Sequence, residues 1–84
     1  MQTFERGSMI LVEIEIFPDH LWKDMFVSEL FLPNDCVISS VLRDDNVIFP
    51  RGNTRIQQRD RVLVLTNHEG LSSLKKQMSG RIKK

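Results

Sequence analysis

The sequence predicts a small α+β domain of two layers, with helices on a mostly antiparallel sheet, and three observations predict it. First, 84 residues are enough for one domain and too few for two. Second, apolar residues alternate with polar ones near the start of the chain and recur every three to four residues near its end. Third, turn residues separate short β-branched runs between these two parts. The expected order is β-α-β-β-β-α.

The first strand is expected from Ile10 to Ile16. Apolar residues occupy every second position of this segment, and Glu13 and Glu15 lie between them, so one face is buried and the other is acidic. Residues 1–9 are polar and show no such period. They are predicted to be a linker or leader segment outside the core.

A short amphipathic helix of about two turns is expected next. Pro18 ends the first strand, and Asp19 is a suitable N-cap. Apolar residues then recur at steps of three and four, namely Leu21, Trp22, Met25, Phe26 and Leu30. Pro33 and the residues after it end the helix.

The middle of the chain predicts a β-hairpin. Val37–Arg43 is β-branched and apolar, residues 44–46 are turn residues, and Val47–Phe49 forms the returning strand. Pro50–Asn53 has strong turn chemistry, and Thr54–Ile56 is expected to be a brief edge strand.

The last strand, Arg61 to Leu65, is apolar on both faces. Val62 and Val64 face one way, and Leu63 and Leu65 face the other. A domain of this size can supply cover for only one of these faces. We therefore expect a second copy of the chain to cover the other. The four residues are the candidates for a homodimer interface, with Leu63 and Leu65 favoured over Val62 and Val64.

A helix closes the domain. Thr66 and Glu69 have the spacing of a capping box, and the buried stripe that follows consists of Leu71, Leu74 and Met78. Gly80 is expected to end the helix. The predicted domain therefore covers residues 10–79, and residues 80–84 form a basic tail.

Charge divides the chain into two unlike halves. Residues 1–42 carry two basic and seven acidic side chains, whereas residues 43–84 carry ten and four. Nucleic-acid binding requires a basic face without such an acidic counterweight, and there is no tyrosine to stack on bases. The densest basic cluster is predicted to be solvated or paired with Glu13 and Glu15, and it consists of Arg51, Arg55, Arg59 and Arg61. A nucleic-acid adaptor is the weakest alternative.

Other site chemistries find little support. Cys36 cannot form an internal disulfide, which favours a reducing, cytoplasmic setting, and we expect it to be buried. Together with His20 and His68 it gives too few ligands for a metal site. No catalytic triad can be assembled, so the chain is not expected to be an enzyme. No apolar run approaches the roughly 20 residues of a membrane span.

The segment "VISSVLRDDNVIFPRGNTRIQQRDRVLVL" resembles the TrkA C-terminal domain, also called the RCK C-lobe, of potassium-transport regulators. The family pattern has an apolar strand ending in Arg43, a turn, a strand ending in Pro50, then Gly52–Thr54, and Asp60 before the last strand. Upstream, "VEIEI" and "SELFLP" resemble the first strand and short helix of the family. The resemblance covers about residues 10–79.

The chain departs from this family pattern at two turns. The family usually has glycine where this sequence has Lys23-Asp24, and again where it has Arg59. If those glycines serve a positive φ, the turns here must either differ slightly or strain a non-glycine residue.

The resemblance implies regulation rather than catalysis. It implies a homodimer that acts in the cytoplasm, peripheral to the membrane, on a cation channel or transporter subunit. In some members a small ligand such as cyclic-di-AMP binds between two copies. A purely structural dimerisation module without a ligand of its own is the alternative. No GxGxxG phosphate-binding motif is present, so the chain lacks nucleotide binding of the Rossmann type.

The candidate ligand-binding residues surround the predicted hairpin and are Arg43, Asp44, Asn46 and Arg51. Arg43 comes first among them because a guanidinium can hold a phosphate or carboxylate through two parallel hydrogen bonds. The alternative is that Arg43 pairs locally with an aspartate of the turn, which would contribute about 0 to 1 kcal/mol.

Overall fold

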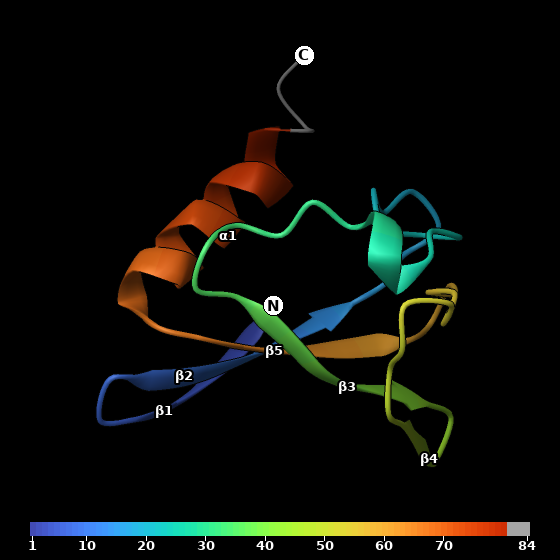
Figure 1. The fold of residues 1–84 in the computed structure, drawn as a ribbon, viewed down its shortest axis with the longest axis horizontal. Helices are drawn as coiled ribbons and strands as arrows, with labels where there is room; N and C mark the ends of the chain where they lie inside the picture. Colours follow the sequence, from blue (N-terminus) through green and yellow to red (C-terminus); the bar gives the residue numbers. More distant parts are fainter. Residues whose placement is uncertain (81–84) are drawn as a thin grey trace.

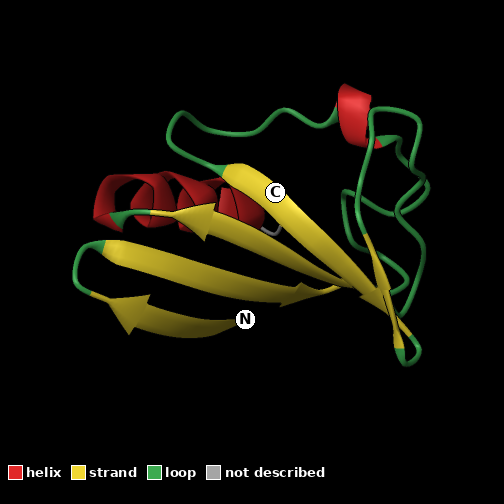
Figure 2. Cartoon of the chain, turned by 60° about the horizontal axis from the view of Figure 1, so that its bottom comes forward, coloured by secondary structure: helices red, strands yellow, loops and turns green. Residues whose placement is uncertain are grey.

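The computed structural model describes residues 1–80 as a five-stranded antiparallel sheet with one α-helix packed on one face (Figures 1 and 2). The strands are β1 (Gln2–Arg6), β2 (Met9–Glu15), β3 (Val37–Arg43), β4 (Asn46–Ile48) and β5 (Arg61–Thr66), and the helix α1 (His68–Gly80) follows. The strand order in the sheet is β1-β2-β5-β3-β4. The predicted α+β class with an antiparallel sheet is therefore confirmed.

The core lies between the sheet and α1. Alternate residues of β2 and β5, together with Val41 of β3, point into it, and Leu74 of α1 meets them from the other side. Trp22 and Ile56 close the core from the connecting segments and are 1% and 0% exposed. The strand residues of this cluster are Ile10, Val12, Ile14, Val41, Val62 and Val64.

Residues 1–9, predicted to be a linker or leader, instead form β1 and its turn into β2. Gly7 and Ser8 are the two loop residues between the paired residues Arg6 and Met9, and Gly7 has a φ of 62°. Glycine with positive φ at the first of two loop residues gives a type II′ hairpin turn. Gly-Ser between two short runs was the signal for this hairpin. All five residues of β1 are exposed.

The predicted helix between Leu21 and Leu30 is wrong, apart from one turn of 3-10 helix, η1 (Val27–Glu29). Its backbone pairs with a distant segment: the Asp24 N–H donates to Ile56 O at 2.7 Å, and the Val27 N–H to Thr54 O at 2.9 Å. These long-range bonds replace the helical ones. The predicted edge strand at Thr54–Ile56 is likewise reduced to an isolated bridge between Phe26 and Arg55.

The N-cap of the last helix lies one residue later in the chain than predicted. Thr66 is the last residue of β5, and its hydroxyl donates to Asp35 O at 2.6 Å. The Asn67 side chain caps α1 instead, because its Oδ1 accepts from the Gly70 N–H at 2.8 Å. Pairing with Ile10 keeps Thr66 in the sheet, so the predicted capping box cannot form. Of the predicted tail, residues 80–84, only Gly80 lies within the described residues.

The two turns at which this sequence lacks the family's glycines do adopt positive φ. Asp24 has a φ of 68° and Arg59 a φ of 78°. Left-handed backbone is rare for an arginine and commoner for aspartate. Of the two alternatives, a non-glycine residue with positive φ is therefore the one found.

Replacing Arg59 by glycine is expected to stabilise the domain by about 0.5 to 1 kcal/mol. The left-handed conformation costs a side-chain-bearing residue about 1 to 2 kcal/mol, and the added freedom of glycine in the unfolded chain offsets part of that gain. The Arg59 side chain is exposed, so little else changes. Urea unfolding measures the difference. Asp24→Gly is the matched control with a smaller expected gain, and a loss of stability in Arg59→Gly would contradict the strain argument.

Candidate functional site

An ion pair between Arg43 and Asp60 connects the end of β3 to the start of β5. Arg43 Nε donates to Asp60 Oδ1 at 2.9 Å, and Arg43 Nη2 donates to Asp60 Oδ2 at 2.8 Å. Asp60 is only 1% exposed, and its Oδ2 also accepts from the Gln57 N–H at 2.8 Å. Two parallel hydrogen bonds and a backbone donor thus satisfy a buried carboxylate.

The same arginine fixes the loop before β5. Arg43 Nη2 also donates to Arg55 O at 2.9 Å. Arg55 in turn donates from Nη1 to Asp24 O at 2.9 Å, and its guanidinium lies 4.4 Å from the centre of the Phe26 ring. The pKa of Arg43 is raised, chiefly by the hydrogen bond to Asp60, against an opposing effect of burial. Arg43 therefore organises the loops at this end of the sheet.

The structure brings together three of the four predicted ligand residues. Arg43 and Asn46 are cross-strand partners, and Asp44 lies in the turn between them with a φ of 56°. Arg51 lies in the turn after β4, where its N–H donates to Thr54 Oγ1, and it makes no hydrogen bond or ion pair with the other three. The local alternative for Arg43 named the wrong aspartate, since its partner is Asp60. The sequence did contain both residues of this pair, because the family pattern includes Arg43 at the end of one strand and Asp60 before the last.

The predicted interface residues of β5 divide between the two faces of the sheet. Val62 and Val64 are 0% exposed in the core under α1, so their prediction as contacts with a partner is wrong for this fold. Leu63 and Leu65 lie on the opposite face, which we call the open face because no helix within residues 1–80 covers it. Helix α1 of the same chain covers Val62 and Val64, so these two residues do not need a partner chain to bury them.

An apolar row crosses the open face. The backbone register places one residue from each of four neighbouring strands side by side, namely Phe4, Leu11, Leu65 and Val37. Phe4 is 53% exposed, Leu65 38% and Val37 61%. Leu63 lies beside this row, next to an ion pair at 3.6 Å between Arg61 and Glu13. This ion pair confirms part of the predicted pairing of the basic cluster with the acidic strand.

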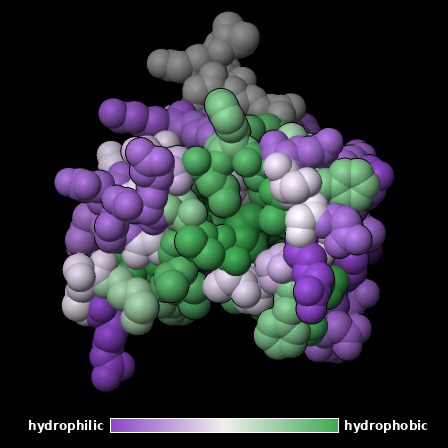
Figure 3. Space-filling view, in the orientation of Figure 1, coloured by the Kyte–Doolittle hydropathy of each residue, from purple (hydrophilic) through white to green (hydrophobic). Residues whose placement is uncertain are grey.

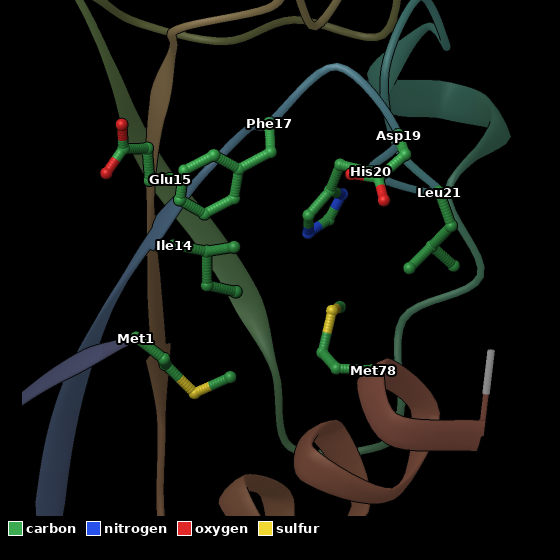
Figure 4. Close-up of a pocket in the computed structure, with 8 residues that line it drawn as sticks. All are labelled: Met1, Ile14, Glu15, Phe17, Asp19, His20, Leu21 and Met78. Carbon is green, nitrogen blue, oxygen red and sulfur yellow. The ribbon is translucent and has the colours of Figure 1, made fainter. Parts of the chain in front are cut away.

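A separate hollow of about 400 Å³ lies between the end of β2, the turn that follows it and the end of α1 (Figure 4). Figure 3 shows apolar side chains gathered in the middle of one face of the molecule, with polar ones on either side. None of the predicted ligand residues lines the hollow, whose residues are Met1, Ile14, Glu15, Phe17, Asp19, His20, Leu21 and Met78. No pattern in the sequence had predicted this hollow.

Neither a membrane span nor a metal site is found in the part of the chain that the structure describes. No helix within residues 1–80 has the length and apolar character needed to cross a bilayer. In the same residues no three side chains of the metal-binding types come close enough to share an ion.

Comparison with known proteins gives consistent similarities. Residues 11–79 match the TrkA-C domain family. A Trk system potassium uptake protein TrkA homolog of Archaeoglobus fulgidus is 29% identical over 73 residues, and a trkA homolog 1 of Methanosarcina mazei is 27% identical over 73 residues. The aligned region covers 87% of this chain but only 17% and 18% of those two relatives.

A solved structure described as an RCK domain with cda has a TM-score of 0.67 to this chain at 22% sequence identity. The alignment covers 81% of this chain and 96% of that one. The similarity in fold therefore extends over almost the whole of that domain.

Proposed function

The chain belongs to the TrkA-C domain family, and from this premise we propose that it is a regulatory domain of a potassium or other cation transport system. It dimerises and senses, or transmits, the binding of a small ligand that controls transport. Its partner is a membrane channel or transporter subunit, and it works on the cytoplasmic side of the membrane. The observation that carries the proposal is the match of residues 11–79 to this family.

The apolar row supports dimerisation through the open face. The row runs across four adjacent strands, and three of its four residues are more than a third exposed. Contiguous apolar surface of this kind is a recognised sign of a protein contact. A second copy related by a two-fold axis would place the same row against itself, so Leu63 and Leu65 would be covered by their counterparts.

The ligand we propose is an anionic nucleotide, with cyclic-di-AMP as the first candidate. We take the cda of the similar RCK domain to be this molecule. Its phosphates call for arginine donors, and the candidate residues are Arg43, Asp44, Asn46 and Arg51. In Arg43, Nε and Nη2 already bond to Asp60 and to Arg55 O, which leaves Nη1 for a ligand. Arg51 is exposed and keeps its whole guanidinium available, so it is the stronger phosphate contact.

One set of variants tests the dimer and the ligand together. Leu65→Glu places a charge in the apolar row, and we expect it to halve the mass measured by sedimentation and to abolish the heat of cyclic-di-AMP binding in calorimetry. Phe31→Glu is the matched control, because Phe31 is 89% exposed but lies near α1, where its carbonyl accepts from Gln77. This control should leave both the mass and the binding heat unchanged.

Arg51→Ala tests the phosphate contact without disturbing the fold. We expect at least about tenfold weaker binding, which corresponds to the loss of one charge-assisted hydrogen bond. A wild-type chain that associates but gives no heat with cyclic-di-AMP or other nucleotides would contradict the sensor and favour a structural dimerisation module. A wild-type chain that stays monomeric would contradict the dimer.

A further inference from the structure

The two edges of the sheet differ in how well they are protected against pairing with another strand. At one edge, β4 is only three residues long and Pro50 follows it closely, and short strands and prolines both discourage pairing. At the other edge, β1 has five residues, contains neither proline nor lysine and is in unbroken register with β2. Within residues 1–80 no further strand pairs with it. The outer edge of β1 is therefore open to another strand.

The turn geometry decides which backbone groups of β1 point to this outer edge. A two-residue loop is closed by a hydrogen-bonded pair, here Arg6 and Met9, and such pairs alternate along an antiparallel ladder. Phe4 therefore directs its N–H and C=O toward β2. Thr3 and Glu5 direct theirs away from the sheet, where they are free to bond to another strand.

We propose that β1 pairs in antiparallel fashion with β1 of a second copy of this chain, around a two-fold axis at Phe4. In this register Thr3 of each copy lies opposite Glu5 of the other, and these two residues exchange their outward N–H···O bonds. Gln2 lies opposite Arg6, and the two Phe4 side chains are neighbours on the open face. A second copy of the chain fits as the partner, because in this register no charged residue of β1 lies opposite a residue of like charge.

Other two-fold registers suit the strand less well. Centring the pair on Glu5 would place two carboxylates directly opposite each other, which is destabilising in a sheet. Centring it on Thr3 would leave Arg6 beyond the partner strand and shorten the ladder. The Phe4 register uses all five residues of β1.

This edge contact is compatible with the dimer proposed above, and only the size of the final assembly rests on that proposal. A two-fold axis between antiparallel edge strands is perpendicular to the sheet, so it joins two apolar rows into one row on a ten-stranded sheet. The axis of a face-to-face dimer is parallel to the sheet. Perpendicular two-fold axes that intersect generate a closed assembly of four chains, a common symmetry for soluble proteins.

Glu5→Pro tests the edge pairing. Proline removes an outward N–H but no bond to β2, and the restriction it places on Phe4 favours extended backbone. We expect sedimentation to give four chain masses for the wild type and two for Glu5→Pro. Glu5→Gln, which keeps the N–H, should behave as the wild type. Contacts between Phe4 and Leu11 in NMR spectra show whether the β1–β2 hairpin is intact in each variant.

A cross-link tests the register. Residues opposite each other at a non-hydrogen-bonded site have Cα atoms about 4.5 Å apart, within the range of a disulfide. Phe4→Cys should therefore oxidise rapidly to a covalent dimer, whereas Phe31→Cys, at an exposed site elsewhere, should not. The native Cys36 is buried and contributes little background.

The outcomes separate this contact from the face-to-face dimer. Leu65→Glu alone should leave a two-chain assembly that Phe4→Cys still cross-links, and Leu65→Glu combined with Glu5→Pro should be monomeric. A wild type of two chain masses that Glu5→Pro does not change, with no faster cross-linking of Phe4→Cys than of Phe31→Cys, would overturn the edge pairing and leave the face-to-face dimer intact.

Discussion

Arg43→Ala is expected to lower the free energy of unfolding by about 3 to 5 kcal/mol, the usual cost of removing one partner from a buried ion pair. Asp60 is 1% exposed beside the 30% exposed side chain of Arg43, so its largely buried carboxylate would lose two charge-assisted hydrogen bonds. The loop would also lose the bond to Arg55 O. Since small domains have a total stability of about 5 to 15 kcal/mol, this loss is a large share of it.

Urea unfolding measures this loss, with the fluorescence of Trp22 as the signal, because it is the only tryptophan and is 1% exposed. Arg43→Lys keeps the charge but not the paired donors, so we expect about half the loss and a folded protein. Arg51→Ala is the control at an exposed arginine and should stay within about 0.5 kcal/mol of the wild type. Equal stability of Arg43→Ala and Arg51→Ala would show that the pair does not hold the fold together.

Arg43 contributes this stability over the whole neutral pH range. Its pKa is raised above the usual value for arginine, chiefly by the hydrogen bond to Asp60, so the folded protein holds the proton more tightly than the unfolded chain. A group of this kind stabilises the fold fully below its unfolded pKa, and the contribution is lost only as the pH rises through the higher folded value. No change near neutral pH is therefore expected from Arg43.

Gly70→Ala is expected to destabilise the domain by about 3 kcal/mol, although alanine is the better helix former by about 1 kcal/mol. Gly70 is buried in the first turn of α1. A methyl group there would collide with Thr66 Oγ1 and lie 2.8 Å from Asp35 O and 3.2 Å from Cys36 Sγ. It would thus disrupt the 2.6 Å hydrogen bond from Thr66 to Asp35 O, which connects the end of β5 to the segment before β3.

Ser72→Ala is the matched control on the exposed side of the same helix. It makes the same change toward a better helix former without a neighbour to displace, so a gain of a few tenths of a kcal/mol is expected. Thermal unfolding of the two variants compares them directly. Similar melting temperatures for Gly70→Ala and Ser72→Ala would show that α1 can move away from β5 at little cost, contrary to the packing described above.

Local pattern predicted much of the sheet and of the candidate site. The alternation in β2 placed its buried residues correctly, and the turn at Asp44 placed Arg43 and Asn46 side by side. It missed the partner of Arg43, because Asp60 is 17 residues away and the family pattern contains both residues without indicating that their side chains pair. It also assigned Val62 and Val64 to an interface, because it could not show which face α1 covers.

The sequence by itself determined the class of this protein: the alternation of apolar residues defines strands, the spacing after β5 defines a helix, and the turn chemistry around Arg43 and Asp60 places it in its family. Only the tertiary structure decided the conformation between Leu21 and Leu30 and the role of β1. Long-range hydrogen bonds outweighed a weak local helix preference in the first case. In the second, pairing with β2 gave order to a strand with no buried side chain.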